Sequence, residues 1–411
     1  MTPISQDFAP PFKLIAPFFI LGSLFYLVST FFLFSFHATD LSFVNPKVLG
    51  FTHLFLLGFV MMIIFGAMAQ LVPVVLEVGH FAVELFYAIW PLLFIGTLLM
   101  FFGFLYLSAL LPFGGVIVLM AMMIFVSEIF LTLKKVKKLS LVMSTILLSN
   151  IFLFFGIIVG LTMSLVYAGN LSLDISALLR AHVYLLIGGY INITIMGLSV
   201  VLLPMFGLSH GFSLKALKIA LFMMSFGVVF VAISAIFKVL STEYFGYFLS
   251  IGSLFIYFYQ IYSIYKTRAR KEKDIYVVSM LFSYMSLIVA LLFGTIYLLN
   301  SYEPLLLASA WLMFFGFFGF IITGHMYKII PFLVWFERFS PLVGKQKVPM
   351  LADMLPKQSS SAQFIFCAFG VVLVTIALLS NNTQLIYAGA SFLVVGAFAL
   401  LRSVLYMINF K

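Results

Sequence analysis

Charged residues are scarce in this 411-residue chain. Asp, Glu, Lys and Arg together make up only 8% of it, whereas hydrophobic residues make up 64% and the mean hydropathy is +1.25. A soluble protein of this length needs about a quarter of its residues charged to keep its surface wet. The shortage of charge therefore excludes a water-exposed surface over most of the molecule and indicates an integral membrane protein.

Cysteine and the common catalytic signatures are also lacking. The one cysteine, Cys367, lies inside an apolar run, so no disulfide framework is expected. The chain contains no HExxH, Walker-loop, CxxC or serine-hydrolase motif. No cleavable signal peptide is expected, because a polar, proline-containing start leads at Lys13 into the first long apolar run. The net charge of +10 indicates membrane topology rather than nucleic-acid binding, because the basic residues gather in short loops.

Apolar runs of 20 residues or more are abundant. A segment that crosses a bilayer must satisfy its own backbone hydrogen bonds, which a helix does, whereas barrel strands are short and alternate polar with apolar residues. We therefore predict an all-α polytopic membrane protein, in contact with the lipid bilayer through about twelve transmembrane helices. The expected spans are 14–36, 48–73, 81–106, 109–133, 140–168, 176–205, 213–238, 243–266, 275–299, 304–331, 362–381 and 384–407.

The basic residues predict how these spans are oriented. The lysine- and arginine-rich loops 134–138, 266–273 and 345–357 all fall on one side of the membrane if the twelve spans are right. Of the 22 lysines and arginines, the opposite side has only Lys47, Arg180 and Lys238. Because basic loops stay in the cytoplasm, we expect a bacterial inner-membrane protein with both termini in the cytoplasm.

The longest expected loop, 332–361, falls on the cytoplasmic side. It mixes Phe, Trp and Leu with basic residues, a composition typical of a segment that lies along the membrane surface. The loop is either an interfacial connector or a docking surface for a partner protein.

One motif recurs in the second, sixth and tenth predicted spans. It consists of glycine, seven residues, glycine, six residues and proline. The three copies are Gly58/Gly66/Pro73, Gly189/Gly197/Pro204 and Gly316/Gly324/Pro331. Their prolines are 131 and 127 residues apart, which corresponds to four helices each time. The spacing predicts a single membrane domain built from three related four-helix units, approximately 14–133, 140–266 and 275–407.

The motif glycines have two interpretations. Glycines eight residues apart lie roughly on one helix face and allow close approach of a neighbour or a flat cofactor. In the second interpretation they serve helix packing alone. The candidate cofactor-contacting residues are Gly58, Gly66, Gly189 and Gly197.

Histidines precede the motif in two of the three spans. His53 lies five residues before Gly58 and His182 lies seven before Gly189, and both are expected near the outer ends of their helices. Because histidine is costly in lipid, a neutral imidazole here is a candidate ligand for haem iron or copper. His37, at the outer end of the first span, is a further candidate metal ligand. Alternatively, His53 and His182 are interfacial and hydrogen-bonded to backbone or water.

A second group of polar residues is expected near the cytoplasmic ends of the spans. Such a group could serve proton or ion entry, although single polar residues near helix ends are common. Its members are His325, Gln70, Glu77, His80, Glu84 and His210.

This arrangement resembles subunit I of the haem–copper oxidases, a family of twelve helices in three four-helix units with glycine-rich, proline-ended helices 2, 6 and 10. The segment THLFLLGFVMMIIFGAMAQLVPVV resembles helix 2 of that family in its histidine, its mid-helix glycine and its Leu-Val-Pro end. The resemblance implies that His53 ligates a low-spin haem near the outer face. More loosely, it implies that His182 matches a copper-ligating histidine of helix 6.

Other ligands of that family are missing here. Span 213–238 has no histidine where the family has a His-His pair for copper, and Trp311 occupies the place equivalent to His53 in the tenth span. The resemblance therefore implies a divergent member that is not a competent oxygen reductase. Such a protein would bind haem or copper in electron transfer, O2 or NO response, or cofactor handling. Its partner would be a cytochrome or a respiratory complex, and no nucleic-acid partner is expected.

Two alternatives are a solute transporter without cofactor and an assembly partner of a respiratory complex. A threefold repeat differs from the inverted halves usual in transporters, and no charged pair is expected at mid-membrane. Both points weigh against the transporter.

Overall fold

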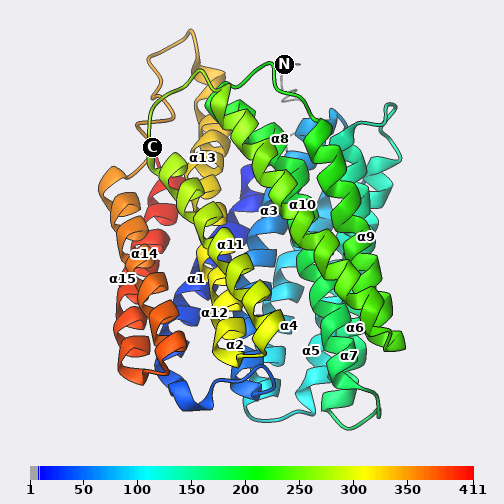
Figure 1. Cartoon of the computed structure of the whole chain (residues 1–411). Coiled ribbons are helices and arrows are strands. Elements are labelled where there is room, and N and C mark those ends of the chain that lie inside the picture. The colour runs from blue at the N-terminus through cyan, green and yellow to red at the C-terminus, as the bar shows by residue number, and fades with distance from the viewer. Residues whose placement is uncertain (1–7, 9) are drawn as a thin grey trace. The chain divides into compact units, whose positions relative to one another are not determined.

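The computed structural model describes Phe8 and residues 10–411, and this part of the chain contains twelve helical spans (Figure 1). Residues 1–7 and 9, in the polar start of the chain, lie outside the described residues. Each span is long and apolar enough to cross a membrane. The predicted all-α polytopic class is therefore confirmed. The α-helices are α1 Phe12–Phe32, α2 Pro46–Phe55, α3 Met62–Leu76, α4 Phe86–Leu105, α5 Leu110–Leu133, α6 Leu141–Tyr167, α7 Ile175–Val183, α8 Ile193–Gly207, α9 Lys215–Phe237, α10 Leu240–Lys266, α11 Ile275–Asn300, α12 Glu303–Trp311, α13 Gly319–Arg338, α14 Lys357–Ser380 and α15 Thr383–Ile408.

Polar residues at the helix ends explain why the boundaries fall where they do. Several helices begin after a side chain whose oxygen accepts a hydrogen bond from a backbone N–H of the first turn. These N-cap residues are Asn45, Ser140, Asp174, Asp274 and Asn382. Other helices end at a residue in the left-handed conformation, which turns the chain out of the helix. These residues are Leu208, Lys238, Ser301 and Asn381.

The motif prolines lie inside their helices rather than at the expected ends. Pro73, Pro204 and Pro331 are each followed by further helical residues of α3, α8 and α13. A membrane helix tolerates proline because neighbouring groups can satisfy the freed carbonyl. The expected loop 332–361 is consequently shorter, since α13 runs to Arg338 and α14 begins at Lys357.

Large apolar side chains are exposed in the middle of the spans. Phe222 on α9, Phe248 on α10 and Phe369 on α14 are each more than half exposed, at 64%, 68% and 59%. Exposure of this kind would be unfavourable in water and is suited to lipid. The chain is therefore a membrane protein that contacts the bilayer through these faces.

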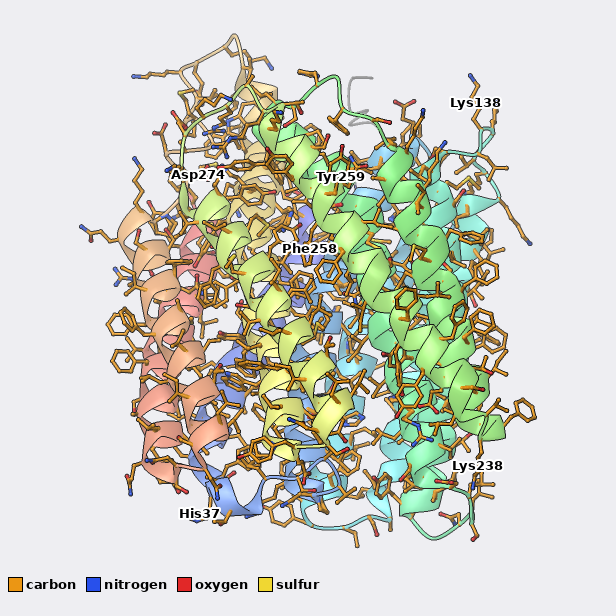
Figure 2. All side chains as sticks on the ribbon, in the orientation of Figure 1. His37, Lys138, Lys238, Phe258, Tyr259 and Asp274 are labelled. Atoms are coloured by element: carbon orange, nitrogen blue, oxygen red, sulfur yellow. The ribbon has the colours of Figure 1, made fainter. Side chains whose placement is uncertain are left out.

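The described chain folds into two compact units. The middle unit contains residues 71–99 and 107–272 together with Phe8, and the terminal unit contains residues 10–70, 100–106 and 273–411. The first predicted four-helix repeat is divided between them. Figure 2 shows that Lys138 and Lys238 lie at opposite ends of the middle unit, and that His37 and Asp274 lie at opposite ends of the terminal unit.

A helical hairpin follows each motif helix, and all three hairpins cross at a pair of glycines. In the middle unit, α9 and α10 lie side by side, and in the terminal unit α14 and α15 do so (Figure 1). A Cβ atom added at the first glycine of each pair would lie 2.8–3.3 Å from the carbonyl oxygen of the second. The pairs are Gly96 with Gly114, Gly227 with Gly246, and Gly370 with Gly389. The same close contact therefore recurs after each of the three motif helices.

Candidate functional site

Each motif helix contains a π-helical segment around its first motif glycine. The segments Leu56–Met61, Tyr184–Asn192 and Leu312–Phe318 join α2 to α3, α7 to α8 and α12 to α13. Single π turns within α-helices are frequently found at functional sites. The same distortion therefore recurs at the same place of the three repeated helices, and it rotates the side chains before it relative to those after it.

The motif glycines pack against the span that precedes each motif helix. A Cβ atom added at the first glycine would lie 2.5–2.6 Å from the facing side chain. These pairs are Gly58 with Phe25, Gly189 with Phe152, and Gly316 with Ser286. The second glycines face residues seven positions earlier in the same spans. These pairs are Gly66 with Phe18, Gly197 with Thr145, and Gly324 with Ser279. Protein side chains thus occupy the glycine faces, as the packing interpretation expects.

His53 lies on α2, two turns after the helix begins, and is half-buried. Its Nδ1 lies 2.8 Å from the carbonyl oxygen of Leu49, and its ring packs on Phe104 with centroids 5.0 Å apart. A carbonyl only accepts hydrogen bonds, so Nδ1 carries the hydrogen and the neutral ring has its lone pair on Nε2. Nε2 is the atom through which this histidine can bind a metal ion.

His182 lies on α7 in the middle unit and packs against α6. Its Nδ1 lies 2.9 Å from the carbonyl oxygen of Gly156, which assigns it the same tautomer as His53. Gly160, one turn further along α6, makes room for the ring, because a Cβ atom there would lie 2.6 Å from Cε1 of His182. The histidine is therefore held at both its ring edge and its Nδ1 by one neighbouring helix.

The three candidate metal ligands are divided between the two units. His53 and His37 belong to the terminal unit and His182 to the middle unit. His37 is exposed, and its Nδ1 lies 3.4 Å from the hydroxyl of Tyr387. Among the described residues, no three His, Cys, Asp or Glu side chains are grouped so that they could hold a metal ion.

Aromatic rings fill the interior of the terminal unit around Trp311. Phe315 stacks on Trp311 and on Phe55, each with centroids 4.2 Å apart, and Tyr26 packs on Phe315 at 5.8 Å. The indole Nε1 of Trp311 donates to the carbonyl oxygen of Val371, 3.1 Å away. A haem held by two histidines therefore does not fit here, because the place equivalent to His53 bears an indole and rings occupy the neighbouring space.

A small apolar cavity of about 80 Å³ adjoins this aromatic group. Its wall includes Phe36, Phe51, Thr52, Trp311 and Ile386. The cavity is well below the roughly 300–1,000 Å³ of typical organic-ligand sites.

The expected cytoplasmic-side polar cluster is distributed over both units. His325 and Gln70 lie in the terminal unit, whereas Glu84 and His210 lie in the middle unit and are exposed. Gln70 is buried, and its amide oxygen accepts no hydrogen bond from a described residue. The structure does not bring these four residues together within either unit.

His325 instead pairs with residues of α11 that the sequence analysis did not single out. Its Nδ1 lies 2.7 Å from the carbonyl oxygen of Ile321, and its Nε2 accepts from the hydroxyl of Tyr276 at 3.4 Å. One turn along α13, Lys328 forms an ion pair with Asp274 at 2.5 Å and lies over the ring of Tyr276. This group ties α13 to α11.

In the middle unit, another ionisable pair joins α7 to α10. Arg180 Nε lies 2.8 Å from Glu243 Oε1, and the same oxygen accepts from the hydroxyl of Tyr247. Nearby, the hydrogen bond from Lys238 and two backbone N–H donors hold the pKa of Asp174 below its usual value. Arg180 and Lys238 are two of the three basic residues that the sequence places opposite the lysine-rich loops.

Uncharged polar groups meet in the middle of the terminal unit. The hydroxyl of Tyr26 on α1 lies 3.5 Å from Sγ of Cys367, and the hydroxyl of Tyr327 donates to Gln363 Oε1 at 3.1 Å. Cys367 and Gln363 are one turn apart on α14, and all four side chains are buried. These pairs join residues more than 30 positions apart, so their spacing in the sequence did not indicate that they are in contact.

No protein-family model matches this chain, and no curated protein matches it in sequence. The fold and the composition define it as an all-α polytopic membrane protein, with twelve spans in the described part of the chain.

Proposed function

We propose that this chain is a metal- or haem-binding membrane protein, a divergent relative of haem–copper oxidase subunit I in which His53 is the ligand. The observation that carries the proposal is the hydrogen bond from Nδ1 of His53 to the carbonyl oxygen of Leu49. Metal-bound histidines commonly hold their second nitrogen in this way, which fixes the tautomer and the ring orientation. Nε2 of His53 is thereby left as the ligand atom.

The repeated architecture supports the proposed relationship. The π-helical segment and both glycine contacts recur in the three motif helices, as expected of related four-helix units. His182 precedes its π-helical segment by two residues and His53 precedes its own by three. We propose His182 as the corresponding ligand position of the middle unit.

The residue that stands at the place equivalent to His53 in the tenth span determines which chemistry is proposed. Trp311 donates to a backbone carbonyl and offers no lone pair, so a group at His53 would have one protein ligand from the motif helices. Haem or copper with an open coordination position can bind O2 or NO or transfer an electron. We therefore propose a role in gas response, electron transfer or cofactor handling, without reduction of oxygen to water.

Elemental analysis of detergent-purified protein, expressed with ample haem and copper, tests this proposal. We expect stoichiometric iron or copper in the wild type and a large loss in His53→Ala. His210→Ala is the matched control, because His210 is exposed and lies outside the spans. Equal metal content in the two variants would contradict the assignment of His53.

A solute transporter without cofactor is the second candidate. It is favoured by the pair Arg180–Glu243 within the spans and by the pair of Lys328 with Asp274, the N-cap residue of α11, because charged groups within membrane spans often mark ion or substrate pathways. Solute-dependent uptake into proteoliposomes by metal-free protein would support this candidate over the first. An assembly role would instead be indicated by co-purification with a cytochrome or a respiratory complex.

We also propose that the protein resides in a bacterial inner membrane with its lysine-rich loops in the cytoplasm. The support is the position of Lys138 and Lys238 at opposite ends of the middle unit (Figure 2). Labelling of Lys138→Cys and Lys238→Cys in intact cells, each in a Cys367→Ser background, tests the orientation. An impermeant thiol reagent should label only the cysteine at position 238.

A further inference from the structure

Glu128 is the sole charged residue of α5 and lies near its end in the middle unit. Its side chain is fully buried, and its Oε1 accepts three hydrogen bonds. The donors are the hydroxyl of Thr132 at 2.7 Å, Nδ1 of His80 at 2.9 Å and the backbone N–H of Phe81 at 3.0 Å. His80 and Phe81 belong to the loop after α3, so this one oxygen fastens the loop to α5.

The other carboxyl oxygen of Glu128 has a different environment. Oε2 is buried and has no hydrogen-bond partner among the described residues. A buried carboxylate with one unmet oxygen is unfavourable, because the charge has lost its hydration without replacement. A proton on Oε2 removes the charge and leaves the three hydrogen bonds to Oε1 in place.

We propose that Glu128 and His80 form a proton-binding site, in which Oε2 of Glu128 takes up and releases one proton. Uptake forms the Oε2–H bond, and release returns the proton to water at the adjacent end of the unit. The lysine-rich loop follows α5 directly, and its Lys138 lies at this end of the middle unit (Figure 2). The site is independent of any metal bound at His53.

Opposing effects act on the two protonation states of Glu128. Burial favours the neutral acid, whereas the three donors on Oε1 favour the carboxylate. The side chain of His80 is 3% exposed and therefore as enclosed as the carboxyl.

Few other ionisable groups face this pair. Lys135 Nζ lies 2.8 Å from the carbonyl oxygen of His80 and 3.4 Å from that of Gly79, and it is exposed. Glu84, on the short 3₁₀ turn Val83–Leu85 that packs against α5, is exposed. Helix α6, which also packs against α5, contains no Asp, Glu, Lys, Arg or His. His80 is therefore the ionisable side chain in direct contact with Glu128.

The composition of the site favours a proton over a metal ion. One carboxylate oxygen is already saturated by three donors, and the described residues contain no group of three His, Cys, Asp or Glu that could hold a metal ion. A divalent cation needs more ligands than Oε2 and one imidazole nitrogen provide.

Infrared difference spectroscopy of the detergent-purified full chain, titrated with acid and base, tests the proposal. In the difference between the wild-type and Glu128→Gln spectra, we expect the carbonyl band of one protonated carboxylic acid, lost on deprotonation. Gln retains an oxygen at the Oε1 position, so the three hydrogen bonds and the fold should persist. Glu272→Gln is the matched control, because Glu272 is an exposed glutamate of the same unit, and it should retain the band.

A second variant keeps the test decisive if Glu128→Gln misfolds. In His80→Phe the carboxylate loses one donor, so the band should persist to higher pH than in the wild type. The proposal is overturned if wild type and folded Glu128→Gln give the same spectra throughout the titration. It is equally overturned if folded His80→Phe leaves the titration of the band unchanged.

Discussion

Trp311 donates its indole N–H to the carbonyl oxygen of Val371 at 3.1 Å and thereby ties α12 to α14. It stands 20 residues before Pro331, as His53 stands 20 residues before Pro73. The two residues occupy equivalent places in repeated helices and differ in role. The histidine retains a lone pair that can bind a metal, whereas the indole is an anchor between helices.

Replacing Trp311 should therefore affect stability rather than cofactor binding. In Trp311→Phe the hydrogen bond to Val371 is lost while the stack on Phe315 can persist, so the free energy of unfolding should fall by about 0.5–1.5 kcal/mol. Thermal unfolding in detergent measures the loss. Iron and copper content should stay at the wild-type level, and a selective loss of metal from a stable variant would place Trp311 in the binding site.

Close helix contact at the motif glycines gives a prediction with an internal control. A Cβ atom at Gly316 would lie 2.6 Å from Cβ of Ser286, whereas one at Gly319 would meet only a backbone oxygen at 3.6 Å. Gly316→Ala should destabilise the protein by about 1–3 kcal/mol through overpacking, and Gly319→Ala should be tolerated. Thermal unfolding of both variants checks this, and equal stability would show that α11 and the π-helical segment can separate freely.

His182 depends on the space that Gly160 leaves. Gly160→Ala should displace the imidazole, because the new Cβ would lie 2.6 Å from its Cε1, and the 2.9 Å contact with Gly156 should lengthen. Metal bound through His182 would then decrease while His53 is unaffected. Gly169→Ala is not a suitable control for the metal content of Gly160→Ala, because Gly169 has a φ of +79°, which strains any other residue. Leu161→Ala, next to Gly160 on α6, is the better control.

The charge of Asp174 should stabilise the folded protein at neutral pH and not in acid. Its pKa is lowered in the folded protein by Lys238 and by backbone donors, so the stabilisation is present above the pKa of the unfolded carboxyl. It is lost as the pH falls through the lowered pKa. Asp174→Asn keeps the helix cap and removes the charge. It should melt slightly below the wild type at neutral pH, and the difference should vanish in acid. A difference independent of pH would assign the effect to the cap.

Much of the fold could be predicted because bilayer crossing imposes long apolar helices, and loop charges separate them. Helix α5, for example, begins one residue from its expected start and ends at the expected residue 133. The motif helices are longer than predicted, because a proline does not end a membrane helix: α13 continues past Pro331 to Arg338. The π-helical segments could not be predicted, since glycine spacing does not encode where an extra residue enters a turn.

The sequence did not predict the contacts between side chains that lie far apart along the chain. Glu128 meets His80 across 48 residues, and Arg180 meets Glu243 across two helices. Which helix faces meet depends on tertiary packing and on the π-helical segments, neither of which the sequence displays. One signal was nevertheless present: Glu128 is a lone acid in a 24-residue apolar helix, and such a residue is a functional candidate.

The optical spectrum of purified protein, oxidised and dithionite-reduced, tests the proposed role of His53 most directly. The wild type should show haem bands that change on reduction, or copper bands when oxidised, and His53→Ala should lose them while His210→Ala retains them. A featureless wild-type spectrum without stoichiometric iron or copper, from cells supplied with both, would contradict the proposed function.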